Sequence, residues 1–295
     1  MKRNTATFFG FVAIVLWSSI VGLIRNVSEG LGAIGGAAMI YTVASVLLWA
    51  LVGLRTLRGA SVRYLVWASV LFVSYELCLA LSIGYAKTGQ QAIEVGMVNY
   101  LWPTFVLLAA ILCNGQRANL LIVPGCLISL VGIVWVLGGE QGLNVPAMLS
   151  NLEDNPLSYG LAFAGAVIWA AYCALTARMA KGANGVTLFF MLAAAALWIK
   201  YGLIGEGTLQ WSLSAVLNVL LAAAAMGLGY AAWNVGIMYG NISVIAGASY
   251  FTPVLSAALA AALLGVPLSS AFWFGAVMVC VGAILCWIST KSKSA

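Results

Sequence analysis

Long apolar segments, repeated along almost the whole chain, constrain this sequence more than any other feature. Ten such runs cover residues 7–24, 33–54, 63–85, 92–113, 118–138, 157–178, 184–204, 212–237, 243–264 and 270–289. A helix needs roughly 20 apolar residues to cross the hydrocarbon core of a bilayer. Only 7% of the residues are charged, whereas a soluble domain carries about 25% and covers its apolar core with polar groups. The sequence therefore predicts an all-α integral membrane protein with ten transmembrane helices.

The charges in the short connections predict an orientation. With the N-terminus in the cytoplasm, the cytoplasmic side holds ten basic residues: Lys2, Arg3, Arg55, Arg58, Arg63, Arg117, Arg178, Lys181, Lys291 and Lys293. The other side holds three, which are Arg25, Lys87 and Lys200. The acidic loop residues all fall outside: Glu29, Glu140, Glu153, Asp154 and Glu206. Because basic loops stay in the cytoplasm, we expect a multi-pass protein of the bacterial inner membrane with both termini cytoplasmic.

The two halves of the chain match each other at a shift of 150 residues. The matches are Tyr100 with Tyr250, Pro103 with Pro253, Gly115 with Gly265, Gly125 with Gly275, and Val131-Gly132 with Val281-Gly282. With a slip of two residues, Phe11 and Trp17 match Phe163 and Trp169. Each half holds five helices, an odd number, so the second half must enter the membrane from the opposite side. We therefore predict a first five-helix repeat (1–138), an outside linker (139–156) and a second, inverted five-helix repeat (157–295) around a central cavity.

Several chemistries are excluded by residues that the chain lacks. It has no histidine, and its six cysteines form no CxxC pair, so neither a metal site nor a disulfide framework is expected. No GxxxxGK[ST] loop occurs, and the single aspartate, Asp154, lies in the outside linker, so ATP hydrolysis by these routes is excluded. The net charge of +6 is spread singly over loops, which argues against nucleic-acid binding. We expect no cofactor and no enzyme activity. Transport down a gradient, exchange and ion coupling all remain open.

Two carboxylates lie inside predicted spans. Glu76 is about halfway along the run 63–85, and Glu94 is near the outer start of the run 92–113. A charge in hydrocarbon is costly, so a retained one indicates function. Glu76 either faces the cavity, where it contacts an ammonium group or carries a proton, or is protonated and hydrogen-bonds a neighbouring helix. Glu94 is close enough to the interface to be simply solvated.

Two prolines interrupt spans at matching places. Pro103 and Pro253 each remove a helical hydrogen bond and kink the helix. Symmetry-related kinks suit hinges for gating. The alternative is that they only bend their helices around a cavity.

Aromatic side chains gather in the middle of spans, although Trp and Tyr usually prefer the interfaces. They are Trp17, Tyr75, Tyr100, Trp102, Trp169, Tyr172, Tyr230, Trp233 and Tyr250. The amides Asn99 and Asn234 also lie within spans, and Asn99 shares a helix face with Trp102. Helix packing is one interpretation for any single residue. As a group they predict a cavity for an amphipathic organic ligand that carries an aromatic ring.

Five strings carry a resemblance to a known family: AIVLWSSIVGLIRNVSEGLG, LFVSYELCLALSIGYA, QAIEVGMVNYLWP, YAAWNVGI and SYFTPVLSAALA. The chain resembles the drug/metabolite transporter superfamily, in its EamA-like group, and within that group the bacterial exporters of aromatic amino acids. The resemblance implies a ten-helix basket whose cavity is lined mainly by helices 1, 3, 4, 6, 8 and 9. On those helices it implies the substrate-binding candidates Trp17, Tyr75, Glu76, Asn99, Trp102, Trp169, Trp233, Asn234 and Tyr250.

The resemblance also implies a function. It is export of phenylalanine, tyrosine and tryptophan by alternating access without ATP hydrolysis, with Pro103 and Pro253 as hinges. The alternative is efflux of aromatic or quaternary cations such as viologens, with Glu76 as the counter-charge. The expected partners are a small amino acid and membrane lipid, with no nucleic acid, and the expected state is a monomer.

Overall fold

The computed structural model describes residues 2–54, 57, 59–205 and 209–290, and the regular elements in these ranges are helices. Among the described residues, eight helical segments are long and apolar enough to cross a membrane. Two shorter apolar helices, Ile122–Leu137 and Thr252–Leu264, accompany them. The chain is therefore an all-helical membrane protein, as the composition predicts.

The helices of the first half are α1 (Arg3–Ser18), α2 (Ile20–Leu31), α3 (Ala33–Leu51), α4 (Val62–Gly84), α5 (Gly89–Asn99), α6 (Trp102–Asn114) and α7 (Ile122–Leu137). A 3-10 turn (Gly139–Gln141) and α8 (Val145–Asp154) follow. The second half contains α9 (Pro156–Met179), α10 (Val186–Ile204), α11 (Leu213–Tyr239), α12 (Ile242–Ser249), α13 (Thr252–Leu264) and α14 (Ser270–Thr290). Each predicted apolar run coincides with one of these helices or with two consecutive ones.

Three of the runs are broken into two helices, and each break has a local cause. Ser18 and Ser19 separate α1 from α2, and their hydroxyls donate to carbonyl oxygens one turn earlier at 2.7 Å, which competes with the helical ladder. Pro103 and Pro253 stand in the first turns of α6 and α13, because proline cannot donate to the preceding turn. At the break between α12 and α13, the hydroxyl group of Thr252 donates a hydrogen bond to the carbonyl oxygen of Ser249 at 2.6 Å. This bond satisfies a carbonyl group that the break exposes.

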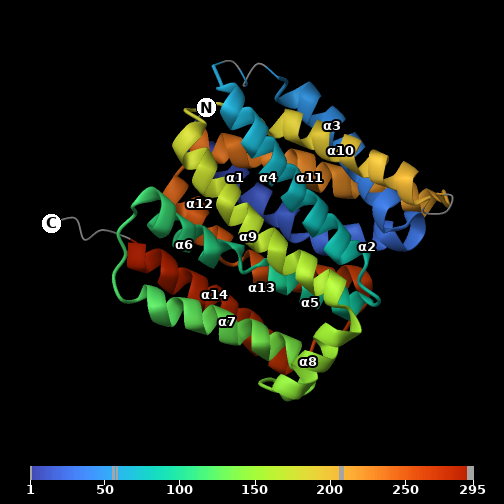
Figure 1. Ribbon diagram of the computed structural model, residues 1–295, viewed down its shortest axis with the longest axis vertical. Helices are drawn as coiled ribbons and strands as arrows, with labels where there is room; N and C mark the ends of the chain where they lie inside the picture. Colours follow the sequence, from blue (N-terminus) through green and yellow to red (C-terminus); the bar gives the residue numbers. More distant parts are fainter. Residues whose placement is uncertain (1, 55–56, 58, 206–208, 291–295) are drawn as a thin grey trace.

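The polar linker contains a helix that the sequence analysis did not anticipate. α8 begins after Asn144, whose side chain accepts a hydrogen bond from the backbone N–H of Ala147, and Pro146 occupies its first turn. Both features favour the start of a helix. α8 precedes α9 without a long connection, and Figure 1 shows it at the lower edge of the molecule beside the end of α7.

The helices pack in pairs that join the two halves of the chain. The most extensive contacts are α7 with α14, α1 with α11, α4 with α9, and α3 with α10. Figure 1 shows α7 and α14 side by side along the lower left edge, while α4 and α9 cross the middle of the view. At the first pair the backbones meet closely, since a Cβ on Gly132 would lie 2.9 Å from the carbonyl oxygen of Gly275. Small residues allow this approach between helices in a membrane.

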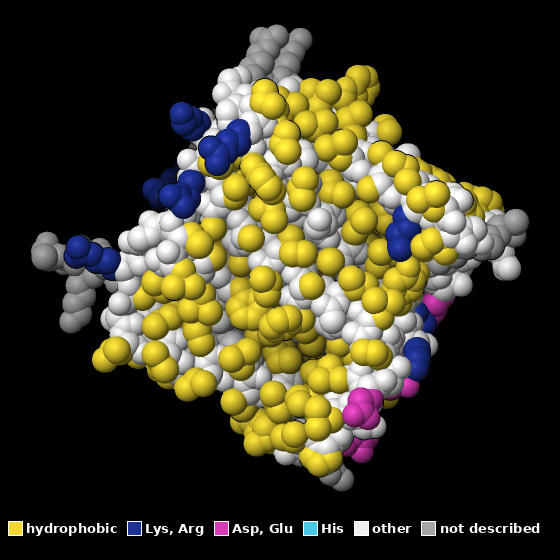
Figure 2. Space-filling model, in the orientation of Figure 1, with side chains coloured by type: hydrophobic (Ala, Val, Ile, Leu, Met, Phe, Trp, Pro, Cys, Tyr) yellow, Lys and Arg dark blue, Asp and Glu magenta, His cyan; other side chains and the backbone are white. Residues whose placement is uncertain are grey.

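The outer surface suits a bilayer. Large apolar side chains are well exposed around the molecule, with Leu112 at 82%, Leu120 at 87% and Leu203 at 81% of their full accessibility. Figure 2 shows most of the visible Lys and Arg near one edge, acidic groups near the opposite edge, and apolar side chains between them. Such a continuous apolar surface marks a membrane-embedded protein. Of the loop charges used to predict orientation, Arg55, Arg58, Glu206, Lys291 and Lys293 lie outside the described residues.

Candidate functional site

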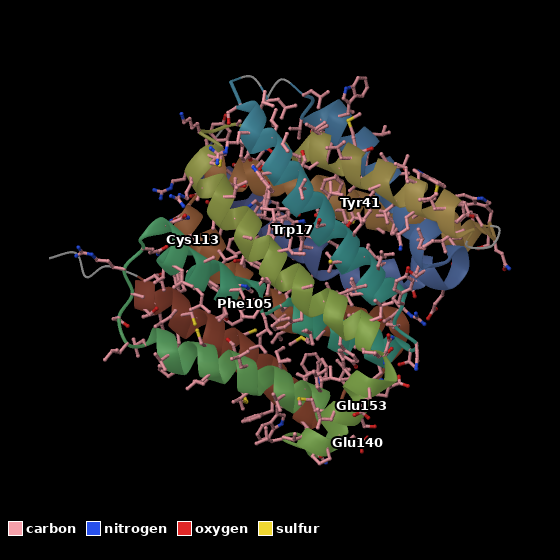
Figure 3. All side chains as sticks on the ribbon, in the orientation of Figure 1. Trp17, Tyr41, Phe105, Cys113, Glu140 and Glu153 are labelled. Atoms are coloured by element: carbon pink, nitrogen blue, oxygen red, sulfur yellow. The ribbon has the colours of Figure 1, made fainter. Side chains whose placement is uncertain are left out.

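A cavity of about 230 Å³ lies among α1, α2, α4, α5, α6, α9, α11, α12 and α13, so both halves of the chain enclose it. Seven of the nine predicted binding residues line it: Trp17, Tyr75, Glu76, Asn99, Trp102, Trp169 and Trp233. They come from helices that are far apart in sequence. Figure 3 places Trp17 and Tyr41 in the middle of the molecule, far from Glu140 and Glu153 at one end. The structure therefore gathers most of the predicted residues around one cavity.

One aromatic wall of the cavity is built by α1 and α11. The ring of Trp17 lies 5.1 Å from that of Tyr230 and 5.1 Å from that of Trp233. Gly229 makes room for this indole, because a Cβ there would lie 2.7 Å from its Nε1 atom. Trp17 Nε1 is buried without a hydrogen-bond partner among the described residues, so an acceptor on a ligand or a water would satisfy it.

A second aromatic wall is built by α4, α6 and α9. Trp169 is at its centre, with ring distances of 4.5 Å to Tyr75, 5.0 Å to Tyr172 and 6.4 Å to Trp102. These separations fall in the range of favourable aromatic pairs, each worth about 0.5–1.5 kcal/mol beyond the burial of area. The rings hold one another in place, and Tyr75, Trp102 and Trp169 line the cavity.

Among the described residues that line the cavity, Glu76 is the one with a carboxyl group, and its side chain is fully buried. Tyr41 donates a hydrogen bond to its Oε2 atom at 2.5 Å, and Tyr230 donates to its Oε1 atom at 2.9 Å. The ion pairs among the described residues join Arg25 to Glu29 and Lys87 to Asp154, so no described cation pairs with Glu76. A carboxylate oxygen can accept about two hydrogen bonds, which leaves Glu76 able to receive a donor from the cavity.

Asn99 is held in place by a hydrogen bond that joins the first half of the chain to the second. Its Nδ2 atom donates to the carbonyl oxygen of Ala162 in α9 at 3.2 Å. Gly165 lies next to this amide, since a Cβ there would be 3.1 Å from the same nitrogen. The small residues of α9 therefore let Asn99 sit at the junction of α5 and α9 while lining the cavity.

Two predicted residues are not on the cavity lining. Tyr250 is buried, and its ring lies 5.7 Å from that of Trp287 in α14. Asn234 lies next to Trp233 in α11, and its Nδ2 atom is buried without a hydrogen-bond partner among the described residues. Glu94 is also away from the lining, and it accepts hydrogen bonds from Gln90 and Tyr159, each at 2.8 Å.

Ten further lining residues were not among the nine binding candidates, although Tyr100 and Tyr230 belong to the mid-span aromatic group that predicts the cavity. They are Ile20, Val21, Leu79, Gly96, Tyr100, Cys173, Met226, Tyr230, Ser249 and Thr252. Tyr230 had a detectable signal, because it stands three residues before Trp233 on the same helix face. Tyr41, which holds Glu76, had a weaker one: a tyrosine in the middle of an apolar helix needs a polar partner.

A polar network joins the ends of several helices, away from the cavity. The ammonium group of Lys87 lies 2.6 Å from Asp154, and Gln91 donates to the same carboxylate at 3.1 Å. The hydrogen bonds from Lys87 and Gln91 hold the pKa of Asp154 below its usual value. Arg25 donates to the carbonyl oxygen of Ala86. The network therefore links α2, the α4–α5 connection and the end of α8, just before α9.

Long apolar helices around an aromatic cavity define a multi-span membrane protein with a site for a small solute, which is the architecture of a transporter. Residues 156–288 match the model of the EamA-like transporter family. The aromatic amino acid exporter YddG of Salmonella typhimurium (strain 14028s / SGSC 2262) is 58% identical over 99% of this chain and 100% of its own length. The aromatic amino acid exporter YddG of Escherichia coli (strain K12) is 55% identical over 99% of both chains. This chain therefore belongs to the EamA-like transporter family, as its sequence motifs predict.

A solved structure supports the fold independently. A crystal structure with 24% sequence identity superimposes with a TM-score of 0.68 and covers 99% of this chain and 100% of its own. At that identity the likeness concerns the fold alone.

Proposed function

We propose that this protein exports aromatic amino acids, chiefly phenylalanine, tyrosine and tryptophan, across the bacterial inner membrane by alternating access without ATP hydrolysis. The two relatives named as aromatic amino acid exporters share 58% and 55% identity with it over nearly the full length. The observation that carries the proposal is the cavity itself. Its walls are aromatic, and its carboxyl group, Glu76, has two phenol donors and no described cation as partner.

The cavity suggests how an aromatic amino acid binds. Its ring lies between the wall of Trp17 and Trp233 and the wall of Tyr75, Trp102 and Trp169, since all five of these side chains line the same cavity. Its ammonium group donates a hydrogen bond to Glu76, and the opposite charges strengthen this contact. Asn99 and the indole N–H of Trp17 serve the carboxylate.

We further propose that the chain consists of ten spans in two inverted repeats, residues 1–138 and 157–295, joined by the outside linker 139–156. The bounds of α6 and α13 differ by 150 residues at both ends. Both helices end at a glycine in the left-handed region, Gly115 with φ 68° and Gly265 with φ 64°. The shift found in the sequence thus recurs in the secondary structure.

The contact between α7 and α14 supports a two-fold relation. Gly132 faces Gly275, and Gly125 faces Gly282. The two pairs are equivalent under the shift of 150 residues, because Gly125 corresponds to Gly275 and Gly132 corresponds to Gly282. The contacts also run in opposite directions along the two helices, so α7 and α14 are antiparallel, as inversion requires.

Opposite entry of the two halves is supported by the polar network. Arg25 directly follows the first predicted span (7–24) and donates a hydrogen bond to the carbonyl oxygen of Ala86. The adjacent Lys87 donates a hydrogen bond to Asp154, just before α9. The first membrane segment therefore ends on the side from which α9 starts. We assign this side to the outside, since Figure 2 shows acidic groups near one edge and basic groups near the other. Both termini are then cytoplasmic.

Alternating access requires helices that bend. Pro103 and Pro253 stand at the interruptions between α5 and α6 and between α12 and α13, next to the lining residues Trp102 and Thr252. Broken helices of this kind form the sites of many transporters. We propose that both breaks act as hinges and that the network around Asp154 holds the outer end closed.

The test is release of labelled phenylalanine from proteoliposomes that contain the purified protein and no ATP. We expect release well above that of protein-free vesicles, and competition by tyrosine and tryptophan but not by aspartate. Release equal to that of empty vesicles, with the protein shown to be inserted and folded, would refute the proposal.

The buried carboxyl in an aromatic cavity also favours a second candidate, efflux of aromatic cations such as viologens. Glu76→Gln separates the two. If both substrates use Glu76 as counter-charge, the variant loses viologen and phenylalanine transport together. Loss of viologen transport with intact phenylalanine transport assigns the carboxyl to cation efflux and contradicts its role with the ammonium group.

A further inference from the structure

A second cavity lies outside the substrate site, on the membrane-facing surface between α6 and α9. It is an open groove of about 840 Å³, and its walls are mainly Ala, Leu, Val, Phe and Met side chains. Its lining includes the small residues Ala109 and Ala171, whose short side chains leave space between the two helices. Figure 3 marks two positions on its α6 wall, Phe105 near the middle of the molecule and Cys113 toward the edge where Figure 2 shows Lys and Arg.

Two cations, Arg63 and Arg178, line the same groove. Both are at one end of it, because α4 and α9 are antiparallel. The contacts that show this are Gly165 with Cys78, Trp169 with Tyr75, and Tyr172 with Phe72. Arg63 begins α4 and Arg178 ends α9, so the guanidinium groups share one end of the bundle.

Neither arginine forms an ion pair with a carboxylate among the described residues. The ion pairs found there are Arg25 with Glu29 and Lys87 with Asp154. None of the described residues that line the groove is acidic. Both arginines are exposed, so they are available to an anion at the membrane surface. An arginine binds phosphate with a planar pair of donors.

The groove has the length of one leaflet. On α9 it extends from Val167 to Met179, which is about 18 Å of helix axis at roughly 1.5 Å per residue. One leaflet contributes about 15 Å of hydrocarbon, half of a core that is roughly 30 Å thick. A molecule with a phosphate at one end and an acyl chain at the other therefore matches both the charge and the length.

We propose that this groove is a binding site for an anionic phospholipid, with the acyl chain between α6 and α9 and the phosphate on Arg63 and Arg178. Basic pockets between transmembrane helices recognise anionic headgroups in this way. The site is separate from the aromatic cavity, and the proposal does not depend on which solute the protein carries.

The test is native mass spectrometry of the full-length protein with phosphatidylglycerol or phosphatidylethanolamine of the same acyl chains. We expect tighter binding of phosphatidylglycerol, and a loss of about tenfold in its affinity in Arg63→Gln/Arg178→Gln. Arg117→Gln is the matched control, because Arg117 is exposed in the α6–α7 loop and does not line the groove. Equal binding of the two lipids, or equal affinity in the double variant and the control, would overturn the proposal.

A second pair of variants tests the acyl chain independently of charge. Ala171→Trp fills the groove, whereas Ala195→Trp adds the same side chain to an exposed position on α10. We expect the first to displace phosphatidylglycerol and the second to retain it. Equal binding in both would show that the lipid does not occupy the groove, and displacement of the lipid by phenylalanine would make the groove a solute site instead.

Discussion

Trp169 offers the sharpest test of the proposed stacking site, because four aromatic rings pack around it in one wall of the cavity. Its ring centroid lies 4.5 Å from that of Tyr75 and 5.0 Å from that of Tyr172. Trp169→Ala removes the ring that would stack on the substrate. One aromatic pair contributes about 0.5–1.5 kcal/mol beyond burial of area. With part of the apolar contact added, we expect a loss of about 2 kcal/mol in substrate binding, or roughly thirtyfold in affinity.

The assay is the concentration dependence of phenylalanine flux in proteoliposomes. Trp169→Phe keeps a ring at this position and should retain most of the affinity. Trp287→Ala is the matched control, since Trp287 also pairs with a tyrosine, at 5.7 Å, but does not line the cavity. Each variant is first checked for expression and for its thermal unfolding temperature. An affinity that is unchanged in Trp169→Ala, or lowered equally in Trp287→Ala, would refute the stacking argument.

Three further predictions concern the supporting structure. Tyr41→Phe removes a hydrogen bond to Glu76 and should lower the stability of the protein by about 1.5 kcal/mol, so an unchanged unfolding temperature would contradict this contact. Gly282→Ala would place a Cβ 2.6 Å from a backbone carbonyl oxygen of α7 and should cost about 2 kcal/mol by overpacking; full stability in the same thermal assay would argue against the close approach. Because the pKa of Asp154 is lowered in the folded protein, its pairing with Lys87 should stabilise the protein above the usual aspartate value of about 3.9 and be lost as the pH falls through the folded value. A pH series should show this loss in the wild type but not in Asp154→Asn.

Much of the fold follows from one-dimensional properties of the sequence. The ten apolar runs coincide with observed helices, because the length needed to cross a bilayer and the polarity of loops are local properties. The breaks before α6 and α13 follow from Pro103 and Pro253 for the same reason. The break at Ser19 was missed, since a serine pair interrupts a helix only when its hydroxyls bond the preceding turn. α8 was missed because a short polar helix has no apolar run to mark it.

The site was harder to predict because it depends on which face of each helix turns inward. Trp17, Glu76 and Asn99 were found because a polar or amphipathic group at mid-span needs a reason to be there. Tyr250 met the same criterion but packs against Trp287 instead of lining the cavity. Tyr41 was overlooked, since only tertiary structure brings α3 next to Glu76. Residue type therefore predicts the kind of site, while the rotation of each helix decides its members.

Counterflow in proteoliposomes tests the central claim, carriage of an aromatic solute by one site that faces each side in turn. Vesicles loaded with unlabelled phenylalanine receive trace labelled phenylalanine outside, without ATP, and with or without a pH gradient. We expect the label to rise transiently above its equilibrium level in phenylalanine-loaded vesicles and not in vesicles loaded with aspartate. A monotonic approach to equilibrium, whatever the vesicles contain, would indicate a channel or no transport and would contradict the account.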